Sequence, residues 1–285
     1  MTSELELRQF ALKIRIGIVE AIHAKGGGHI GGSLDLAELL AVLYADFMRV
    51  RPEEPQWPGR DYLICSKGHA GPALYAALAL KGFFDYNLLK TLNQEKTTLP
   101  GHCDRIKVPG IDATTGSLGQ GLSIASGTAL GLKLKKSTQR VFCILGDGEL
   151  AEGQNWEAAQ LAAHYQLDNL VAFLDWNKKQ IDGSNDRVMR LGDPVEKFVA
   201  FGWNSMLVQG DDPVAIQQAI CHALERKNGE PTAIILDTVK GAGVSAVAEL
   251  SNNHCIGFGE ALFEKSFAEL EDQGKNLNVE VCKCL

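Results

Sequence analysis

The amino-acid sequence predicts an α/β fold in which helices cover both faces of a parallel sheet. Two apolar runs, residues 141–145 and 170–174, have the length and composition of buried strands. The segment between them has room for a turn and a helix, as a right-handed βαβ unit requires. Further apolar runs alternate with helical patterns along the chain, and this alternation favours a parallel sheet.

One domain over residues 1–285 is the simplest organisation. Hydrophobic residues make up 45% of the chain and charged residues 22%, which is ordinary usage for a globular protein. The chain shows no internal repeat, no low-complexity run and no convincing linker. We therefore expect a single core, with a helical N-terminal layer and a short C-terminal tail.

The N-terminal part reads as two helices separated by glycines. Apolar residues recur at helical spacing over residues 5–25, and Gly26, Gly27 and Gly28 then end this helix. Leucines follow at helical spacing after Ser33. We therefore expect Ser33 to cap a second helix.

The middle of the chain repeats an order of strand, glycine loop and helix. Residues 62–64 are predicted to form a short strand, and the helix after the next glycine loop is expected to reach about residue 80. Residues 97–116 are rich in proline, glycine and threonine, which indicates an irregular loop of a length that is often functional. Residues 119–131 are expected to be helical, although their glycines weaken a helix.

The part that follows the two central strands continues the alternation. Residues 204–209 and 233–237 are predicted to be strands, and residues 213–226 form a helical pattern between them. These elements extend the same parallel sheet.

Charge and cysteine usage exclude several classes of function. The formal net charge is -7, which argues against an electrostatic grip on nucleic acid or on an anionic membrane. No uninterrupted apolar span approaches the roughly 20 residues of a transmembrane helix. The seven cysteines are scattered without a CxxC pair, which is typical of reduced thiols, and the terminal Cys282 and Cys284 are expected to be incidental. We expect a cytoplasmic protein.

Two polar residues follow the central strands and predict a magnesium site. Asp147 lies in a Gly-Asp-Gly turn after the first strand, and Asn177 follows the second. The carboxyl ends of parallel strands meet at one edge of a sheet, so these side chains should lie side by side. Mg²⁺ takes about six oxygen ligands. Asp147, the Asn177 amide and a carbonyl near Lys179 would supply three, and diphosphate oxygens and water the rest. Asp147 by itself could instead be a helix cap.

Four of the seven histidines lie in loops. His29, His69 and His102 each follow glycine, and His254 lies in a polar segment, whereas the other three fall within helical patterns. Each loop histidine could stand there by chance. Together near the strand ends they would form a titratable pocket suited to proton transfer on substrates rich in hydroxyl groups.

Glycine-rich segments also occur in nucleotide-binding proteins, but their motifs are missing from this chain. No glycine fingerprint opens a first βαβ unit with an acid about 20 residues later, and no Walker lysine motif is present.

The ordered motifs resemble those of the N-terminal, pyrophosphate-binding part of transketolases. The resemblance covers most of the chain and depends on these segments in this order: Gly28-His29, Lys67-Gly68-His69, Pro100-Gly101-His102, residues 114–121, Gly146-Asp147-Gly148 and His254. It departs at Ile30, where the family usually has proline, at Cys103-Asp104, where it has proline and glutamate, and at Trp176, where it has asparagine.

The resemblance implies a cofactor and roles for individual residues. The cofactor is thiamine diphosphate with Mg²⁺, or Ca²⁺ or Mn²⁺ in its place. Asp147, Asn177 and the Lys179 carbonyl are implied metal ligands. His29, His69, His102 and His254 would handle substrate oxygens and protons. The implied cofactor contacts are His69, Gly116, Ser117, Leu118, Asp147, Gly148, Glu152, Asn177 and His254.

Glu152 has two interpretations. From composition alone it is a solvated acid in the first turn of a helix beginning near Asn155. The resemblance implies instead an acid that links paired active sites across a dimer.

The resemblance also implies a partner. In this family the acid that protonates the cofactor's aminopyrimidine and the basic residues that hold the sugar phosphate lie in a following domain, which this chain does not carry. We therefore expect a split enzyme, in which this subunit joins a C-terminal subunit with the pyrimidine-binding domain, as a homodimer or heterotetramer.

The expected reaction transfers a two-carbon ketol unit from a ketose, expected to be phosphorylated, to an aldose. Two alternatives stay open at this stage. The first is another thiamine diphosphate enzyme, of the 2-oxo acid decarboxylating or deoxyxylulose phosphate synthase type. The second is a cofactor-binding subunit without activity.

Overall fold

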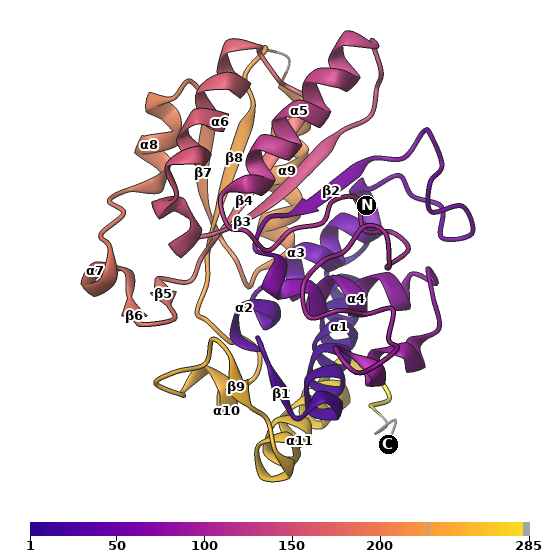
Figure 1. Cartoon of the computed structure of the whole chain (residues 1–285). Helices are drawn as coiled ribbons and strands as arrows, with labels where there is room; N and C mark the ends of the chain where they lie inside the picture. The colour runs from indigo at the N-terminus through magenta and orange to yellow at the C-terminus, as the bar shows by residue number, and fades with distance from the viewer. Residues whose placement is uncertain (227, 282–285) are drawn as a thin grey trace.

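The computed structural model of the protein describes residues 1–226 and 228–281. Its central sheet has five parallel strands in the order β2, β3, β4, β8, β7 (Figure 1). These are β2 (Tyr62–Cys65), β3 (Val141–Gly146), β4 (Leu170–Trp176), β7 (Asn204–Gln209) and β8 (Thr232–Asp237). Two-residue strands pair outside this sheet, β1 (Gly27–Gly28) with β9 (Ile256–Gly257) and β5 (Lys179–Gln180) with β6 (Gly183–Ser184).

Helices surround the sheet. The longer ones are α1 (Glu4–Lys25), α4 (Gly71–Leu80), α5 (Gln120–Leu134), α6 (Gly153–His164), α9 (Pro213–Glu225) and α11 (Glu260–Leu277). The shorter ones are α2 (Gly31–Leu34), α3 (Ala37–Val42), α7 (Asn185–Val188), α8 (Pro194–Ala200) and α10 (Ser245–Ala248). Leu43–Phe47 (η1) forms a π-helix, and Gly68–Ala70 (η2), Tyr86–Thr91 (η3) and Gly148–Ala151 (η4) form 3₁₀-helices.

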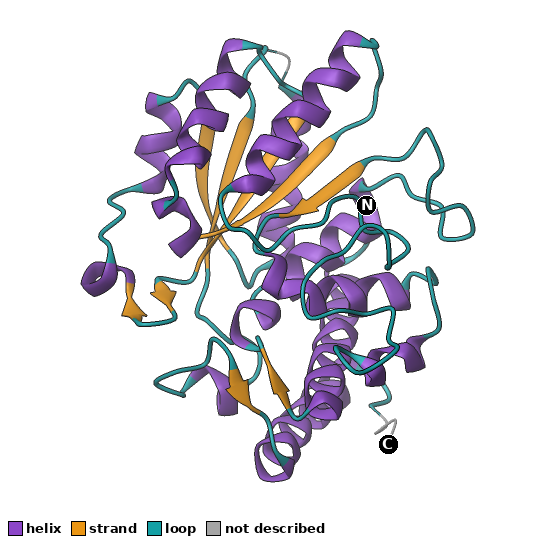
Figure 2. Cartoon of the chain, viewed as in Figure 1, coloured by secondary structure: helices purple, strands orange, loops and turns teal. Residues whose placement is uncertain are grey.

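The strands are buried on both faces because their residues alternate between two cores. In β3, Phe142 and Ile144 enter one cluster of buried side chains, whereas Cys143 and Leu145 enter the other. Helices α1, α3, α4, α9 and α11 contribute to the first cluster, and α5, α6 and α8 to the second. Figure 2 shows helices on both sides of the strands. The predicted α/β fold with a parallel sheet covered on both faces is therefore confirmed.

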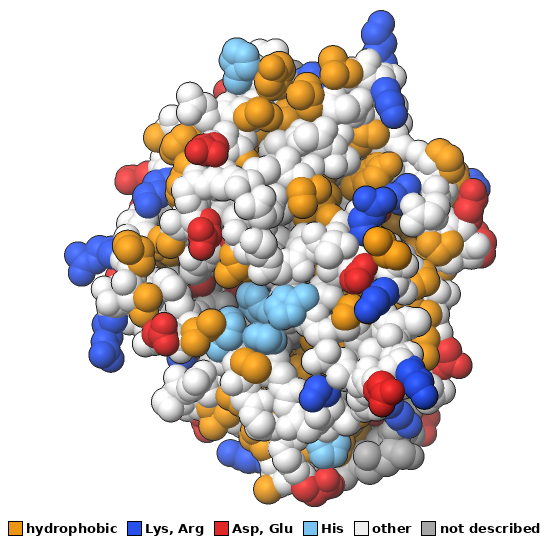
Figure 3. All heavy atoms as spheres, in the orientation of Figure 1, with side chains coloured by type: hydrophobic (Ala, Val, Ile, Leu, Met, Phe, Trp, Pro, Cys, Tyr) orange, Lys and Arg blue, Asp and Glu red, His pale blue; other side chains and the backbone are white. Residues whose placement is uncertain are grey.

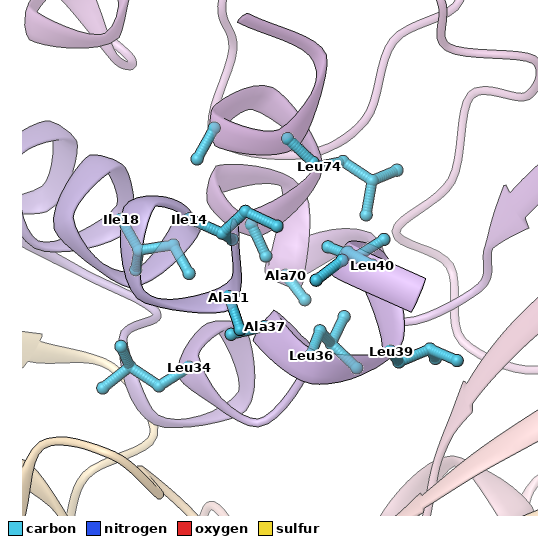
Figure 4. Close-up of a cluster of buried hydrophobic side chains, with 14 of the residues drawn as sticks. Ala11, Ile14, Ile18, Leu34, Leu36, Ala37, Leu39, Leu40, Ala70 and Leu74 are labelled. Atoms are coloured by element: carbon cyan, nitrogen blue, oxygen red, sulfur yellow. The ribbon is translucent and has the colours of Figure 1, made fainter. Parts of the chain in front are cut away.

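The N-terminal helices pack through small and branched side chains. Figure 4 shows Ala11, Ile14 and Ile18 of α1 beside Leu34, residues of α3 and Leu74 of α4. Helix α1 starts at a capping box made by Ser3 and Glu6, and Gly26 ends it with φ of 81°. Glycine adopts this left-handed conformation without the Cβ strain of other residues.

Most predicted elements lie within two residues of the observed ones. One prediction was wrong: Ser33 does not cap the second helix. It lies inside α2 and its hydroxyl donates to the His29 carbonyl at 2.6 Å, while α3 starts at Leu36 without a side-chain cap. Helix α11 was not expected, although Phe263, Phe267 and Leu270 give it a buried stripe at helical spacing. Cys282 and Cys284 lie outside the described residues.

The sheet brings the predicted site residues to one edge. Gly146 at the end of β3 pairs with Asp175 near the end of β4, so the turns that carry Asp147 and Asn177 emerge side by side. The strand ends of β8 lie in the same register, with Trp176 paired to Asp237. Among the helices that the structure describes, none has the length and apolarity needed to span a bilayer.

Candidate functional site

Four loop histidines meet at the carboxyl edge of the sheet. The ring centroid of His29 lies 5.3 Å from that of His69, 5.4 Å from that of His102 and 5.3 Å from that of His254. The rings of His69 and His254 are 4.8 Å apart. Figure 3 shows histidine side chains gathered at the middle of one face of the molecule. The structure thus brings together all four histidines that the sequence selected.

These histidines line a cavity of about 490 Å³. The predicted residues Gly116, Leu118, Asp147, Gly148, Glu152, Asn177 and Lys179 line it as well. Ser117 is the predicted site residue that does not. Residues of the β5 to α7 segment form one side, including Gln180, Ile181, Val188 and Met189.

The Asp147 carboxylate is held by main-chain and side-chain donors. One oxygen accepts from the Gly148 N–H at 2.7 Å. The other accepts from the Lys178 N–H at 2.5 Å and from the Asn185 amide at 2.8 Å. Burial, followed by the charge of Asp175, raises the pKa of Asp147 to about 6. A cation bound beside Asp147 would lower that pKa and favour the carboxylate.

Asn177 is oriented by the network beneath it. Its amide nitrogen donates to Asp35 and to Asp175, each at 2.9 Å, and its amide oxygen accepts from the Lys179 N–H at 3.0 Å. The buried Lys67 ammonium forms an ion pair with Asp175, and Asp35 lies in the same group. The amide nitrogen is therefore used within the protein, and the oxygen keeps a lone pair for a ligand.

The donors present fit an oxygen-loving cation. Asp147, the Asn177 amide and the Lys179 carbonyl offer oxygens alone, as Mg²⁺ and Ca²⁺ prefer. The described part of the chain contains no group of three or more His, Cys, Asp or Glu side chains that could hold a metal by themselves. A cation here would thus need further oxygens from a ligand.

Two features fit a phosphorylated ligand in the same cavity. The Gln180 amide nitrogen is buried without a hydrogen-bond partner among the described residues, which leaves a donor for an anionic oxygen. A Cβ on Gly148 would lie 2.9 Å from the Gln180 side chain, so glycine keeps the backbone close to this donor.

Lys240 lines the cavity and was not selected from the sequence. Its ammonium donates to the Lys179 carbonyl at 2.8 Å and lies 2.9 Å from His254 Nδ1. Burial, followed by the nearby Lys67 charge, lowers the pKa of Lys240 to about 8. A lysine directly after a predicted strand and before a glycine-rich segment was the signal that could have found it.

The histidines are surrounded by cations and apolar groups. Burial, then Lys240, lowers the pKa of His254 to about 3. Burial also lowers the pKa values of His29 and His69 below the ordinary range of histidine. These imidazoles are therefore neutral at pH 7 and can accept a proton from a hydroxyl group.

The two acids after the Gly-Asp-Gly turn differ in environment. Glu152 is exposed, precedes α6 and lines the cavity. Glu149 is buried instead, and its carboxylate accepts from Ser66, from the Gly119 N–H at 2.8 Å and from the Gly146 N–H at 3.0 Å. The role of Glu152 across a dimer stays a prediction.

Comparisons with known proteins agree with this geometry. The family described as "Transketolase, thiamine diphosphate binding domain" matches residues 7–273. The chain is 45% identical to the 6-deoxy-6-sulfo-D-fructose transketolase subunit SqwG of Clostridium sp. (strain MSTE9), over 95% of this chain and 98% of that protein. It is 39% identical to one of the subunits named for the apulose-4-phosphate transketolase of Phocaeicola vulgatus, over 85% of each chain.

Solved structures show the same fold. A transketolase of Pichia stipitis superposes with a TM-score of 0.86 and 31% identity, covering 98% of this chain and 41% of that one. The transketolase of Campylobacter jejuni gives a TM-score of 0.87 and 29% identity, covering 98% of this chain and 44% of that one. The chain therefore spans less than half the length of these solved enzymes.

Proposed function

The chain belongs to the transketolase family, and on that basis we propose that it is the N-terminal subunit of a split, thiamine diphosphate-dependent transketolase. The observation that carries the proposal is the cavity in which four histidines face the Asp147 and Asn177 pair. Two similar proteins that match the chain over most of their own length are named as transketolase subunits, which supports this function over the alternative thiamine diphosphate reactions.

In the proposed site the two ends of the cofactor meet different groups. Asp147, Asn177 and the Lys179 carbonyl hold Mg²⁺, and the metal and the Lys240 ammonium neutralise the diphosphate. Gly148 and the segment from Gly116 to Leu118 bring main chain to the cofactor. When bound, thiamine diphosphate supplies the nucleophilic carbon and the electron sink that breaking a carbon–carbon bond requires.

The histidines act on the sugar substrates. The His29 ring centroid lies 5.3–5.4 Å from those of the other three, so these imidazoles can accept the proton of a ketose hydroxyl and return it to the oxygen of an aldose. His254 touches Lys240, which keeps this imidazole neutral. The substrates in this proposal are a ketose donor and an aldose acceptor, with or without phosphate.

The proposed partner is a separate C-terminal subunit that carries the pyrimidine-binding domain. One side of the cavity holds exposed Leu118 and Ile181, which a partner would cover. We propose a homodimeric or heterotetrameric assembly with Glu152 at a subunit interface. The described cysteines are all free thiols, which supports a cytoplasmic location.

Reconstitution tests the proposal. The chain is assayed for ketol transfer by itself and together with a C-terminal subunit, with thiamine diphosphate and Mg²⁺ present in both assays. We expect transfer from the pair and none from the chain by itself. Full activity of the chain without a partner would refute the split site, and turnover of pyruvate without any ketose would favour a 2-oxo acid enzyme.

A further inference from the structure

Lys240 reaches the site from a segment with little stiffness of its own. The next residues are Gly241, Ala242 and Gly243, and both glycines have left-handed φ, 87° and 84°. Glycine restricts the backbone less than any other residue, so such a segment needs outside contacts to keep one conformation. Yet Lys240 is 4% exposed and its ammonium meets both Lys179 and His254.

Side chains from four other segments supply those contacts. Asp35 accepts from the Gly241 N–H at 2.6 Å, and Asn253 donates to the Lys240 carbonyl at 2.9 Å. Gln273 of α11 donates to the Gly243 carbonyl at 2.9 Å. Arg15 of α1 donates through Nε to the Ala242 carbonyl at 3.2 Å. The main chain of residues 240–243 is therefore held at each residue in turn.

Arg15 is the one of these four that also forms a buried ion pair with a carboxylate outside the segment. Its Nη2 lies 2.6 Å from Glu38 Oε2, and the two side chains are 7% and 8% exposed. A planar guanidinium can meet a carboxylate and a carbonyl at the same time, which an ammonium on a flexible stem does less well. Glu38 thus fixes the fork that holds Ala242.

Gly243 completes the arrangement. A Cβ at this position would lie 2.5 Å from Arg15 Cζ and closer still to Nε, so the guanidinium occupies the space that any other residue would fill. The contact therefore needs a glycine in the segment for steric reasons, and that glycine in turn makes the segment dependent on Arg15.

We infer that Arg15 is a positioning residue for thiamine diphosphate binding: with Glu38 it fixes the segment from Gly241 to Gly243 and so places the Lys240 ammonium at the diphosphate. Arg15 lines a separate cavity on the other side of this segment and does not line the histidine cavity. The inference rests on the proposed function for the ligand, but the effect on the segment can be measured without it.

Three variants separate positioning from simple stability. Arg15→Lys keeps a cation beside Glu38 but loses the fork. The double variant Arg15→Met with Glu38→Leu removes the whole ion pair, and apolar replacement of such a pair is often neutral for stability. Arg8→Met is the matched control, because Arg8 lines the same cavity from the same helix but pairs with exposed Glu4.

The measurements are hydrogen exchange of residues 238–244 in the full chain and calorimetry of thiamine diphosphate with Mg²⁺ in the reconstituted complex. For both Arg15 variants we expect faster exchange in this segment alone and about tenfold weaker cofactor binding, as for other residues that orient a ligand indirectly. Turnover at saturating cofactor should stay close to wild type. Arg8→Met should change neither measurement.

The results divide clearly. Unchanged exchange and affinity in Arg15→Lys would overturn the inference, and so would faster exchange with unchanged affinity. Faster exchange over the whole chain would show a structural role only and would also overturn it. If both Arg15 variants fail to fold, Gln273→Leu loosens the same segment at Gly243 and is expected to weaken binding in the same direction; unchanged affinity there would count against the inference. If the wild-type complex binds no thiamine diphosphate, the proposed function fails, and the exchange data alone decide whether Arg15 holds the segment.

Discussion

The main-chain N–H of Lys178 donates a hydrogen bond of 2.5 Å to the Asp147 carboxylate, and this bond ties the turns after β3 and β4 together. The same carboxylate is the one charged metal ligand in the proposed site. Its position therefore depends on both turns, and a change of this side chain should affect metal binding directly.

Asp147→Asn should abolish or strongly weaken binding of Mg²⁺ and thiamine diphosphate, because it removes the carboxylate from a donor set of otherwise neutral oxygens. We expect a loss of at least about a hundredfold in affinity, measured by calorimetry on the reconstituted complex. Asp168→Asn, which alters a partly exposed acid paired with Lys133, is the control and should bind normally. Equal affinity in wild type and Asp147→Asn would contradict the assigned metal site.

Lys67→Met should destabilise the chain. The substitution leaves the carboxylate of Asp175, which is 0% exposed, without its ammonium partner. Removing one partner of a buried ion pair costs about 3–5 kcal/mol. The free energy of unfolding from urea titration measures the effect.

Lys178→Met is the matched control for that substitution. Its ammonium pairs with Asp237, but the two side chains are 53% and 36% exposed. Such surface pairs contribute about 0–1 kcal/mol. A loss of similar size in both variants would show that burial of the Lys67 pair does not matter.

Lys240→Met should weaken thiamine diphosphate binding while thiamine itself, which lacks the diphosphate, is affected little. The reason is that the Lys240 ammonium faces the end of the cavity where Asp147 and Lys179 lie. Competition between the two ligands in the reconstituted complex measures the difference. Equal weakening of both would place Lys240 elsewhere in the site.

The histidine cavity should make stability fall in acid. The pKa of His254 is lowered to about 3 in the folded chain by burial, then by Lys240, His29 and Lys67, whereas an unfolded histidine titrates near about 6.5. The unfolded state therefore binds more protons between these values. The contribution is fully present above about pH 6.5 and is lost as the pH falls toward 3.

His254→Gln tests that dependence in the chain without cofactor or metal. Urea titrations at several pH values between about 4 and 7 should show a smaller loss of unfolding free energy for the variant than for wild type. His222→Gln, on the surface of α9, is the control. Identical slopes for wild type and His254→Gln would show that His254 titrates normally in the folded chain.

Local patterns in the sequence predicted the sheet and the core of the site. Asp147, Asn177 and the four histidines could be selected because each follows a recognisable strand or glycine or lies in a polar loop, and because strand ends meet at one edge. The helix predicted after Ser33 formed, but close packing of α2 against His29 took the hydroxyl away from a capping role.

Other site residues depend on contacts that local patterns do not contain. Asp35, Lys67 and Asp175 come from three distant segments and become one buried network only after the sheet has formed. Lys240 is similar, because its ammonium reaches Lys179 and His254 only when Arg15 and Gln273 hold the segment that follows it.

The most direct test of the central claim follows two carbon atoms. The chain is incubated with a C-terminal subunit, an unlabelled aldose and a ketose labelled with ¹³C at C1 and C2, in the presence of thiamine diphosphate and Mg²⁺. A ketol transferase moves both labels together into a ketose two carbons longer than the acceptor, and mass spectrometry should find that product with the pair and not with either protein by itself. Recovery of the unlabelled acceptor without any lengthened ketose, across donors with and without phosphate, would contradict the account.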